Sequence, residues 1–121
     1  LVDAAFDGND FYHVEMFVAL AGRHRDLMEE RRMENAYLQG IGRPQNLIFV
    51  REAGGPWDSF TLGFYRDLKH YSESADIPPE AEDRAAIAAG FRGAAQIGAT
   101  LRQFILYHRD TLCVSIPEYS Q

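Results

Sequence analysis

The sequence predicts one α+β domain with the element order β-α-β-β-α-β. Apolar residues alternate with the period of a strand in 11–20 and 59–66, longer segments favour helix, and glycine- and proline-containing breaks separate them. The chain has 121 residues, which is enough for a single core of ordinary size. We expect an N-terminal arm over 1–10, the domain over 11–117 and a C-terminal tail over 118–121.

The first predicted strand, 11–20, determines which of its side chains share a face of the sheet. Successive side chains of a strand point to opposite sides, so His13 and Glu15 lie on one side together with Phe11 and Phe17. The two polar residues therefore share a face with large aromatic ones. The pattern leaves open whether this face contacts the helices or a second sheet.

A helix is predicted over 23–39, which contains neither Gly nor Pro, and Gly40 ends it. Two further strands, 47–52 and 59–66, form a hairpin around a Gly-Gly-Pro turn. Residues 67–74 are expected to form a short helix or turn.

A second long helix is predicted to begin after the pair of prolines at 78–79 and to run to about His108, with a bend between Gly90 and Gly93. Its expected core stripe consists of Ile87, Phe91, Ala94, Gly98, Leu101 and Ile105. The last strand is predicted over 111–116, with Pro117 as its end. The resulting order is the ferredoxin-like arrangement, a four-stranded antiparallel sheet with helices on one face.

Charge and cysteine content exclude several classes of protein. The net charge is −6, from 18 acidic and 12 basic residues, which argues against binding to nucleic acid or to an anionic membrane. No apolar segment is long enough to span a membrane, and the single cysteine, Cys113, cannot form an intrachain disulfide. We expect a soluble protein that is either cytoplasmic or exported after removal of a signal peptide, because the chain begins at Leu1.

The helix over 23–39 carries three polar residues in its apolar sector, at positions where a purely structural helix would carry Leu. The sector is defined by Leu27, Met28 and Leu38, and the polar residues within it are His24, Arg31 and Asn35. Buried groups of this kind must be paired or hydrogen-bonded. They either line a polar cleft that binds substrate, or Arg31 pairs with an internal carboxylate such as Glu15 and supports the fold.

His13 and Glu15 are the candidate catalytic residues, since a histidine beside a carboxylate can act as a general base. The alternative is that they are satisfied core or interface residues. We expect no metal site, because zinc needs about four ligands and the strand supplies two. His70 and His108 could join them only through the tertiary fold.

Aromatic and polar residues also surround the third predicted strand. Trp57 precedes the strand, Tyr65 lies at its end, and His70 and Tyr71 follow it. Such positions often frame ligand pockets, so Trp57, Tyr65 and His70 are candidate substrate-binding residues. Alternatively, Trp57 and Tyr65 fill the core or an interface between subunits.

The strand at 11–20, the helix at 23–39, the hairpin region 46–71 and the terminal segment 111–117 together resemble the dimeric α/β-barrel superfamily. This superfamily includes antibiotic-biosynthesis-monooxygenase-like, NIPSNAP-like and stress-responsive barrel proteins. The resemblance implies two four-stranded sheets that pack face to face across a dimer, with a cleft in each subunit. Its members include cofactor-free oxygenases, haem-degrading enzymes, isomerases and cyclases, so the fold alone does not determine a function.

Both faces of the predicted strands are rich in apolar residues, which favours burial of the second face by a homodimer. The leading functional hypothesis is a small organic ligand and cofactor-free chemistry, as in an oxygenase or isomerase that acts on an enolisable or phenolic substrate. In it His13 is the base, with Arg31 and Asn35 holding the developing oxyanion. The alternatives are a non-catalytic ligand-binding protein and a structural homodimer.

Overall fold

The computed structural model describes residues 2–116 and confirms the predicted α+β class. The strands are β1 (Phe11–Ala19), β2 (Leu47–Val50), β3 (Ser59–Tyr65) and β4 (Ile105–Val114). They form one antiparallel sheet in the order β2-β3-β1-β4. Residues 1 and 117–121 lie outside the described residues, and with them the predicted tail at 118–121 and the expected strand end at Pro117.

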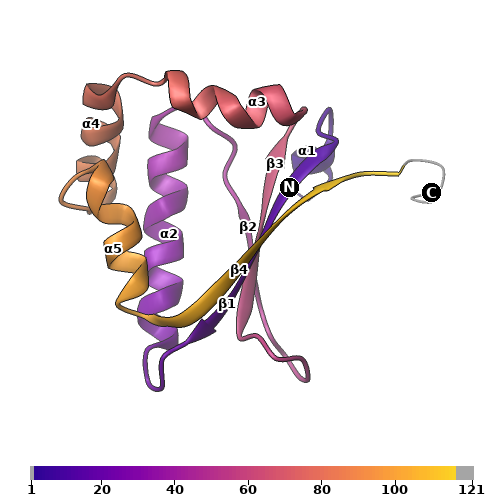
Figure 1. Cartoon of the computed structure of the whole chain (residues 1–121), viewed down its shortest axis with the longest axis vertical. Helices are drawn as coiled ribbons and strands as arrows, with labels where there is room; N and C mark the ends of the chain where they lie inside the picture. The colour runs from indigo at the N-terminus through magenta and orange to yellow at the C-terminus, as the bar shows by residue number, and fades with distance from the viewer. Residues whose placement is uncertain (1, 117–121) are drawn as a thin grey trace.

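The main helices lie on one side of the sheet, as predicted. The helices are α1 (Val2–Phe6), α2 (His24–Gly40), α3 (Leu68–Ser72), α4 (Pro79–Ala89) and α5 (Ile97–Arg102), with 3-10 turns η1 (Glu73–Asp76) and η2 (Ala94–Gln96). Figure 1 shows α2, α4 and α5 grouped together beside the sheet, with α3 at one end of this layer. Within the described residues, no helix is long and apolar enough to cross a membrane.

The predicted helix between 80 and 108 is interrupted after residue 89, where a bend was expected, and is wrong beyond residue 102. The chain leaves α4 at Gly90, whose φ of 107° is a left-handed conformation that glycine adopts readily. A short helix resumes at Ile97, but the chain is already a strand from Ile105 onward, where it pairs with β1. Tertiary pairing thus overrides local helix propensity. Ile87, which was expected in the core, is 60% exposed.

Two apolar clusters hold the helices in place. One lies between the sheet, α2 and α5, and consists of Phe17, Ala19, Leu27, Leu101 and Ile105. The other joins α2 to α4 and the segment after it, and consists of Tyr37, Ala85, Ala86 and Phe91. Between these two clusters, the helix-covered part of the sheet carries polar residues.

The two faces of the sheet differ in character. His13, Glu15 and Phe17 of β1 point toward α2, since Glu15 forms an ion pair with Arg31 of α2 and Phe17 packs in the first core cluster. The opposite face, which we call the open face, carries the residues that alternate along the strands with those facing α2, and most of them are apolar. These include Val14, Met16, Val18, Phe49, Phe60, Leu62 and Phe64. Phe6 of α1 packs against the Tyr12 and Phe64 rings at one end of it.

Candidate functional site

Acids and histidines occupy the part of the sheet that α2 covers. His13 and Glu15 of β1 share this face, and Asp110 of β4 lies directly opposite Glu15 in the antiparallel register. His108 is two residues from Asp110 on the same strand, so its side chain points to the same side. We call His13, Glu15, His108 and Asp110 the His–carboxylate cluster.

Three close contacts link the four side chains of the His–carboxylate cluster. His13 Nε2 is 3.6 Å from Asp110 Oδ1. His108 Nδ1 is 3.3 Å from Asp110 Oδ1 and 3.4 Å from Glu15 Oε2. Glu15 is buried, whereas the Asp110 side chain is 47% exposed on the edge strand. The cluster therefore extends from the interior of the domain to solvent.

A buried ion network holds Glu15 from the side of α2. Arg31, 2% exposed, donates from Nε to Glu30 Oε2 at 2.8 Å, from Nη1 to Glu15 Oε1 at 3.3 Å, and from Nη2 to Glu34 Oε2. Its guanidinium also lies 4.7 Å from the centre of the Phe17 ring. Arg31 therefore binds carboxylates of its own helix and of β1 rather than pointing into an open cleft.

Negative charge outweighs positive charge in this region. Burial, with smaller contributions from the Glu34 and Asp110 carboxylates, raises the pKa of Glu15 to about 8 although Arg31 lowers it. Burial also raises the pKa of Glu30, whose Oε1 has no hydrogen-bond partner among residues 2–116. Among those residues, Arg31 supplies the one guanidinium that forms ion pairs with this group of carboxylates.

A cavity of about 550 Å³ lies next to the cluster. It is bounded by the end of α2, the loop after it, β3, α3 and α4, and its polar lining residues are His13, Tyr37, Arg43, Tyr65, Tyr71, Ser72, Ser74 and Glu82. Leu38 and Ile41 add apolar surface. His13 belongs both to this lining and to the His–carboxylate cluster, so it connects the two.

Aromatic rings and one guanidinium form a wall of this cavity. The Tyr65 and Tyr71 rings are 5.0 Å apart and perpendicular, and the Arg43 guanidinium lies 5.6 Å from the Tyr65 ring centre. Arg43 is fixed by donating to the carbonyl oxygens of His70 at 2.5 Å and Tyr71 at 3.2 Å. Burial raises the pKa of Tyr65, so its hydroxyl is held in the neutral form.

Asn35 and Trp57 lie away from this cavity lining. The Asn35 amide forms two hydrogen bonds with the backbone of Asn46, from Nδ2 to the carbonyl oxygen at 2.9 Å and from the Asn46 N–H to Oδ1 at 2.8 Å. It thereby fixes the loop that enters β2. Trp57 packs edge-on against Phe60, which belongs to the open face.

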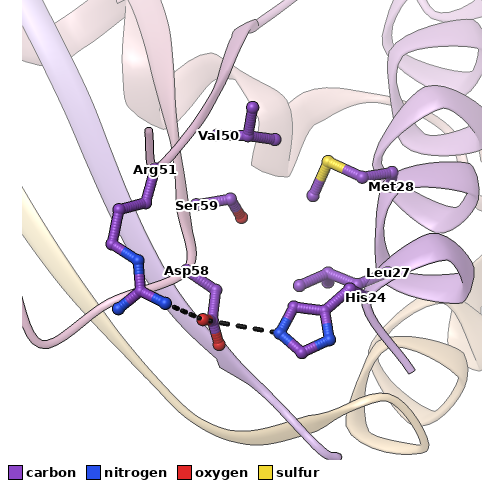
Figure 2. Close-up of a pocket in the computed structure, with 7 residues that line it drawn as sticks. All are labelled: His24, Leu27, Met28, Val50, Arg51, Asp58 and Ser59. Atoms are coloured by element: carbon purple, nitrogen blue, oxygen red, sulfur yellow. Dashed lines mark hydrogen bonds and ion pairs between the residues drawn. The ribbon is translucent and has the colours of Figure 1, made fainter. Parts of the chain in front are cut away.

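His24 lies in a second, smaller pocket at the beginning of α2 (Figure 2). The pocket measures about 200 Å³ and is lined by His24, Leu27, Met28, Val50, Arg51, Asp58 and Ser59. As Figure 2 shows, Asp58 lies between His24 and Arg51, with Oδ1 3.4 Å from His24 Nε2 and 3.2 Å from Arg51 Nη2. His24 is therefore not brought together with His13.

His70 stands behind the aromatic wall. Its Nδ1 accepts the backbone N–H of Arg66 at 3.1 Å, and its ring lies 5.5 Å from that of Tyr65. Burial, followed by the charges of Arg66 and Arg43, lowers the pKa of His70, so the neutral ring that accepts this hydrogen bond is favoured. The His70 ring therefore supports the position of the Tyr65 ring.

Arg43 and Asp110 were not among the predicted site residues, and His108 was named only as a residue that the tertiary fold would have to bring to His13 and Glu15. Arg43 follows a helix in a glycine-containing loop, where no local pattern separates it from a surface residue. His108 was predicted at the end of a helix and Asp110 just before the last strand, so their alternation on a strand was not considered. The His-x-Asp spacing at 108–110, which repeats the His-x-Glu spacing at 13–15, was the available signal.

The assembled site has two chemical capacities. The His13 imidazole, with the Asp110 carboxylate beside it, can accept a proton from a molecule in the cavity. Donor atoms of His13, Glu15 and Asp110 also lie within 4.8 Å of one another, a separation that one metal ion could bridge after small side-chain movements.

Comparisons with known proteins identify the fold. A NIPSNAP family protein from Agrobacterium tumefaciens is 14% identical, with 93% of this chain and 90% of the other covered at a TM-score of 0.64. A NIPSNAP-like domain protein from Burkholderia xenovorans is 13% identical, with coverage of 94% and 90% and a TM-score of 0.61. A dabb family protein with a ferredoxin-like fold from Mesorhizobium loti is 11% identical, with coverage of 89% and 98% and a TM-score of 0.54.

These similarities confirm the ferredoxin-like fold and the predicted likeness to NIPSNAP-like proteins at the level of structure. The sequence matches no family model and no curated protein. Identities this low carry the fold alone, so any function must be argued from the site itself.

Proposed function

We propose that the cavity beside His13 binds a small organic molecule with a phenolic or enolic hydroxyl, and that His13 accepts the hydroxyl proton. The observation that carries this proposal is the position of His13, which lines the cavity and also contacts Asp110 at 3.6 Å. A basic group that faces a cavity and is backed by a carboxylate is suited to proton abstraction.

The walls of the cavity favour a flat ligand. Its volume of about 550 Å³ is within the range of small-molecule sites, about 300–1,000 Å³. Tyr65 and Tyr71 supply aromatic surface, and Leu38 and Ile41 supply apolar surface. The Arg43 guanidinium has five N–H donors, more than its two backbone acceptors occupy, so it can also stabilise an oxyanion.

Proton removal from such a ligand is the first step shared by the two reaction classes that the sequence favours. Loss of the hydroxyl proton gives a phenolate or enolate, which an isomerase reprotonates at carbon and a cofactor-independent oxygenase exposes to oxygen. The imidazolium formed at His13 would be stabilised by Asp110 and by the excess of carboxylates around it.

Spectroscopic titration with para-nitrophenol tests the proposal, because this phenol changes colour when it ionises. We expect saturable binding, with the bound phenol ionised at lower pH than the free one. Tyr65→Ala should weaken binding, and His13→Gln should keep binding but remove the shift in ionisation. His24→Gln, the same change at a histidine outside the cavity, should alter neither.

Two outcomes would decide against this reading. An absence of saturable binding by the phenol would reject the cavity as its site. Binding that leaves the ionisation of the phenol unchanged in the parent chain would favour the alternative, a non-catalytic ligand-binding protein.

We also propose that two copies of the chain associate through the open face. Met16, Phe49 and Tyr107 are 36%, 40% and 43% exposed on this face, beside other apolar residues of β1, β2 and β3. Apolar areas of this kind on a sheet are usually covered by a partner. Sedimentation at micromolar concentration should give twice the mass of the chain, and a monomer would contradict the proposal.

A further inference from the structure

The His–carboxylate cluster combines two histidines and two carboxylates on neighbouring strands. The pairs His13-x-Glu15 and His108-x-Asp110 run along β1 and β4, and the antiparallel register sets Glu15 opposite Asp110. Each histidine therefore lies diagonally across from the acid of the other strand. This arrangement points four nitrogen and oxygen donors toward one region on the same face of the sheet.

We infer that the His–carboxylate cluster binds one divalent transition-metal ion, a site that the sequence analysis did not predict. Donor atoms of His13, Glu15 and Asp110 lie within 4.8 Å of one another. An ion with bonds of about 2.0–2.2 Å to histidine and carboxylate can join three such ligands after small side-chain movements. His108 Nδ1, 3.3 Å from Asp110 and 3.4 Å from Glu15, is the fourth donor.

The charges around the cluster favour a cation. Arg31 contacts Oε1 of Glu15 and shares its charge with Glu30 and Glu34, whereas Oε2 of Glu15 is directed toward His108. One oxygen of Glu15 and the Asp110 carboxylate are thus left facing two imidazoles, which are neutral ligands for a metal ion. A divalent cation would balance the two carboxylates.

Neighbouring groups hold the donors in orientation. Arg31 fixes Glu15 through its other oxygen, the His108 ring stacks on Phe17 with centres 6.1 Å apart, and the Tyr71 ring lies 5.9 Å from that of His13. Supporting contacts of this type raise the affinity of a site because the ligands need little reordering. The half-exposed Asp110 on the edge strand leaves a path from solvent.

The donor set indicates which ions the site would take. Imidazole nitrogens together with carboxylate oxygens suit zinc, iron, cobalt and nickel, whereas calcium and magnesium prefer oxygen ligands. The inference does not depend on the proposed function. Without a metal ion His13 can accept a proton, and with one His13 is a ligand whose ion would lie beside the cavity.

Cobalt(II) added to the purified, metal-free chain, with no phenol present, tests the inference. We expect binding of one equivalent per chain, with visible absorption bands typical of nitrogen and oxygen ligands. Asp110→Asn and His108→Ala should each weaken binding at least about tenfold, since loss of groups that merely orient ligands already lowers metal affinity 10–100-fold. His24→Gln should bind as the parent chain does.

A second measurement on the parent chain avoids reliance on variants. Bound cobalt should broaden the amide NMR signals of residues 13–15 and 108–110 more than those around His24, whose ring contacts Asp58 rather than the cluster. Absence of cobalt binding, binding that survives both Asp110→Asn and His108→Ala, or broadening centred elsewhere would overturn the inference. Because no phenol is used, these results are independent of whether the cavity binds one.

Discussion

The two faces of the sheet reverse the usual distribution of polar and apolar residues. The face covered by α2 carries Glu15, Thr61 and Ser59, all buried, whereas the open face carries Met16 and Phe49, both exposed. In a sheet with one solvated face, the polar side chains normally point outward. The stability of one isolated chain would favour the opposite placement of these residues. The polar residues on the covered face support the proposed site, and the apolar residues on the open face support the proposed dimer.

The largest effect is expected on the open face. The double substitution Met16→Asp with Phe49→Asp should convert the proposed dimer completely to monomer, because two charges would be buried in an apolar interface without partners. Sedimentation velocity measures this directly. Ile87→Asp, the same kind of change at a residue 60% exposed on α4, should leave the dimer intact. If both variants remained dimers, or if both became monomers, the open face would not be distinguished from the exposed surface of α4 as the dimer interface.

Under α2, the largest loss of stability is expected from substitution of Arg31. Arg31→Met leaves Glu15, Glu30 and Glu34 without their guanidinium, and breaking a buried ion pair in this way costs about 3–5 kcal/mol. Urea unfolding measures the loss. The adjacent Arg32, whose ion pair with Glu29 is exposed, provides the control, since Arg32→Met should leave the free energy of unfolding almost unchanged. Similar losses at both positions would mean that burial of the Arg31 network has no special role.

A smaller effect of opposite sign is expected at Ser59. Its hydroxyl is buried and has no hydrogen-bond partner among the described residues, so Ser59→Ala should raise the free energy of unfolding by about 1 kcal/mol. Ser72→Ala removes an exposed hydroxyl that donates to the Lys69 carbonyl oxygen at 2.8 Å and should not stabilise the chain. Destabilisation by Ser59→Ala would show that the hydroxyl has a partner, such as a bound molecule in the pocket of Figure 2.

The smallest effect is expected on the pH dependence of the stability, through His70 of α3. The pKa of His70 is lower in the folded chain than its ordinary value of about 6.5. Below that pH the unfolded chain therefore binds more protons at His70 than the folded chain does. Stability should therefore decrease as the pH falls through this value, as the hydrogen bond from the Arg66 N–H is lost. Thermal unfolding between pH 7 and pH 5.5 should show a smaller decrease for His70→Asn. An identical decrease would assign the effect to other groups.

The sequence was sufficient for most of the fold because β1, β3 and α2 carry strong local patterns. The alternation in 11–20 placed His13 and Glu15 together on one face, and the polar residues within the apolar sector of α2 marked Arg31 as buried. The start of β4 could not be predicted in the same way. Residues 105–110 follow a helical segment, and their polar side chains lie on both faces of the strand, His108 and Asp110 on one and Arg109 on the other. They become a strand through pairing with β1.

The site was predicted less completely for the same reason. Half of the His–carboxylate cluster lies on β4, so its assembly depends on contacts between residues about 95 positions apart, as the pairing of Glu15 with Asp110 illustrates. Local sequence also could not show that the Asn35 amide binds the backbone of Asn46, because that requires the position of the loop before β2. Side-chain chemistry was visible in the sequence, whereas the pairing of distant segments was not.

The alternation of β4 makes the cluster sensitive to a change in chain length. Arg109 lies between His108 and Asp110 and faces the opposite side, where it is paired with Met16. A shift of β4 by one residue would bring Arg109 across from Glu15 and turn His108 and Asp110 to the other face. Insertion of one residue at 103–104, just before the strand, would thus exchange the proposed metal donors of β4 for an ion pair while every one of those donors remained in the protein.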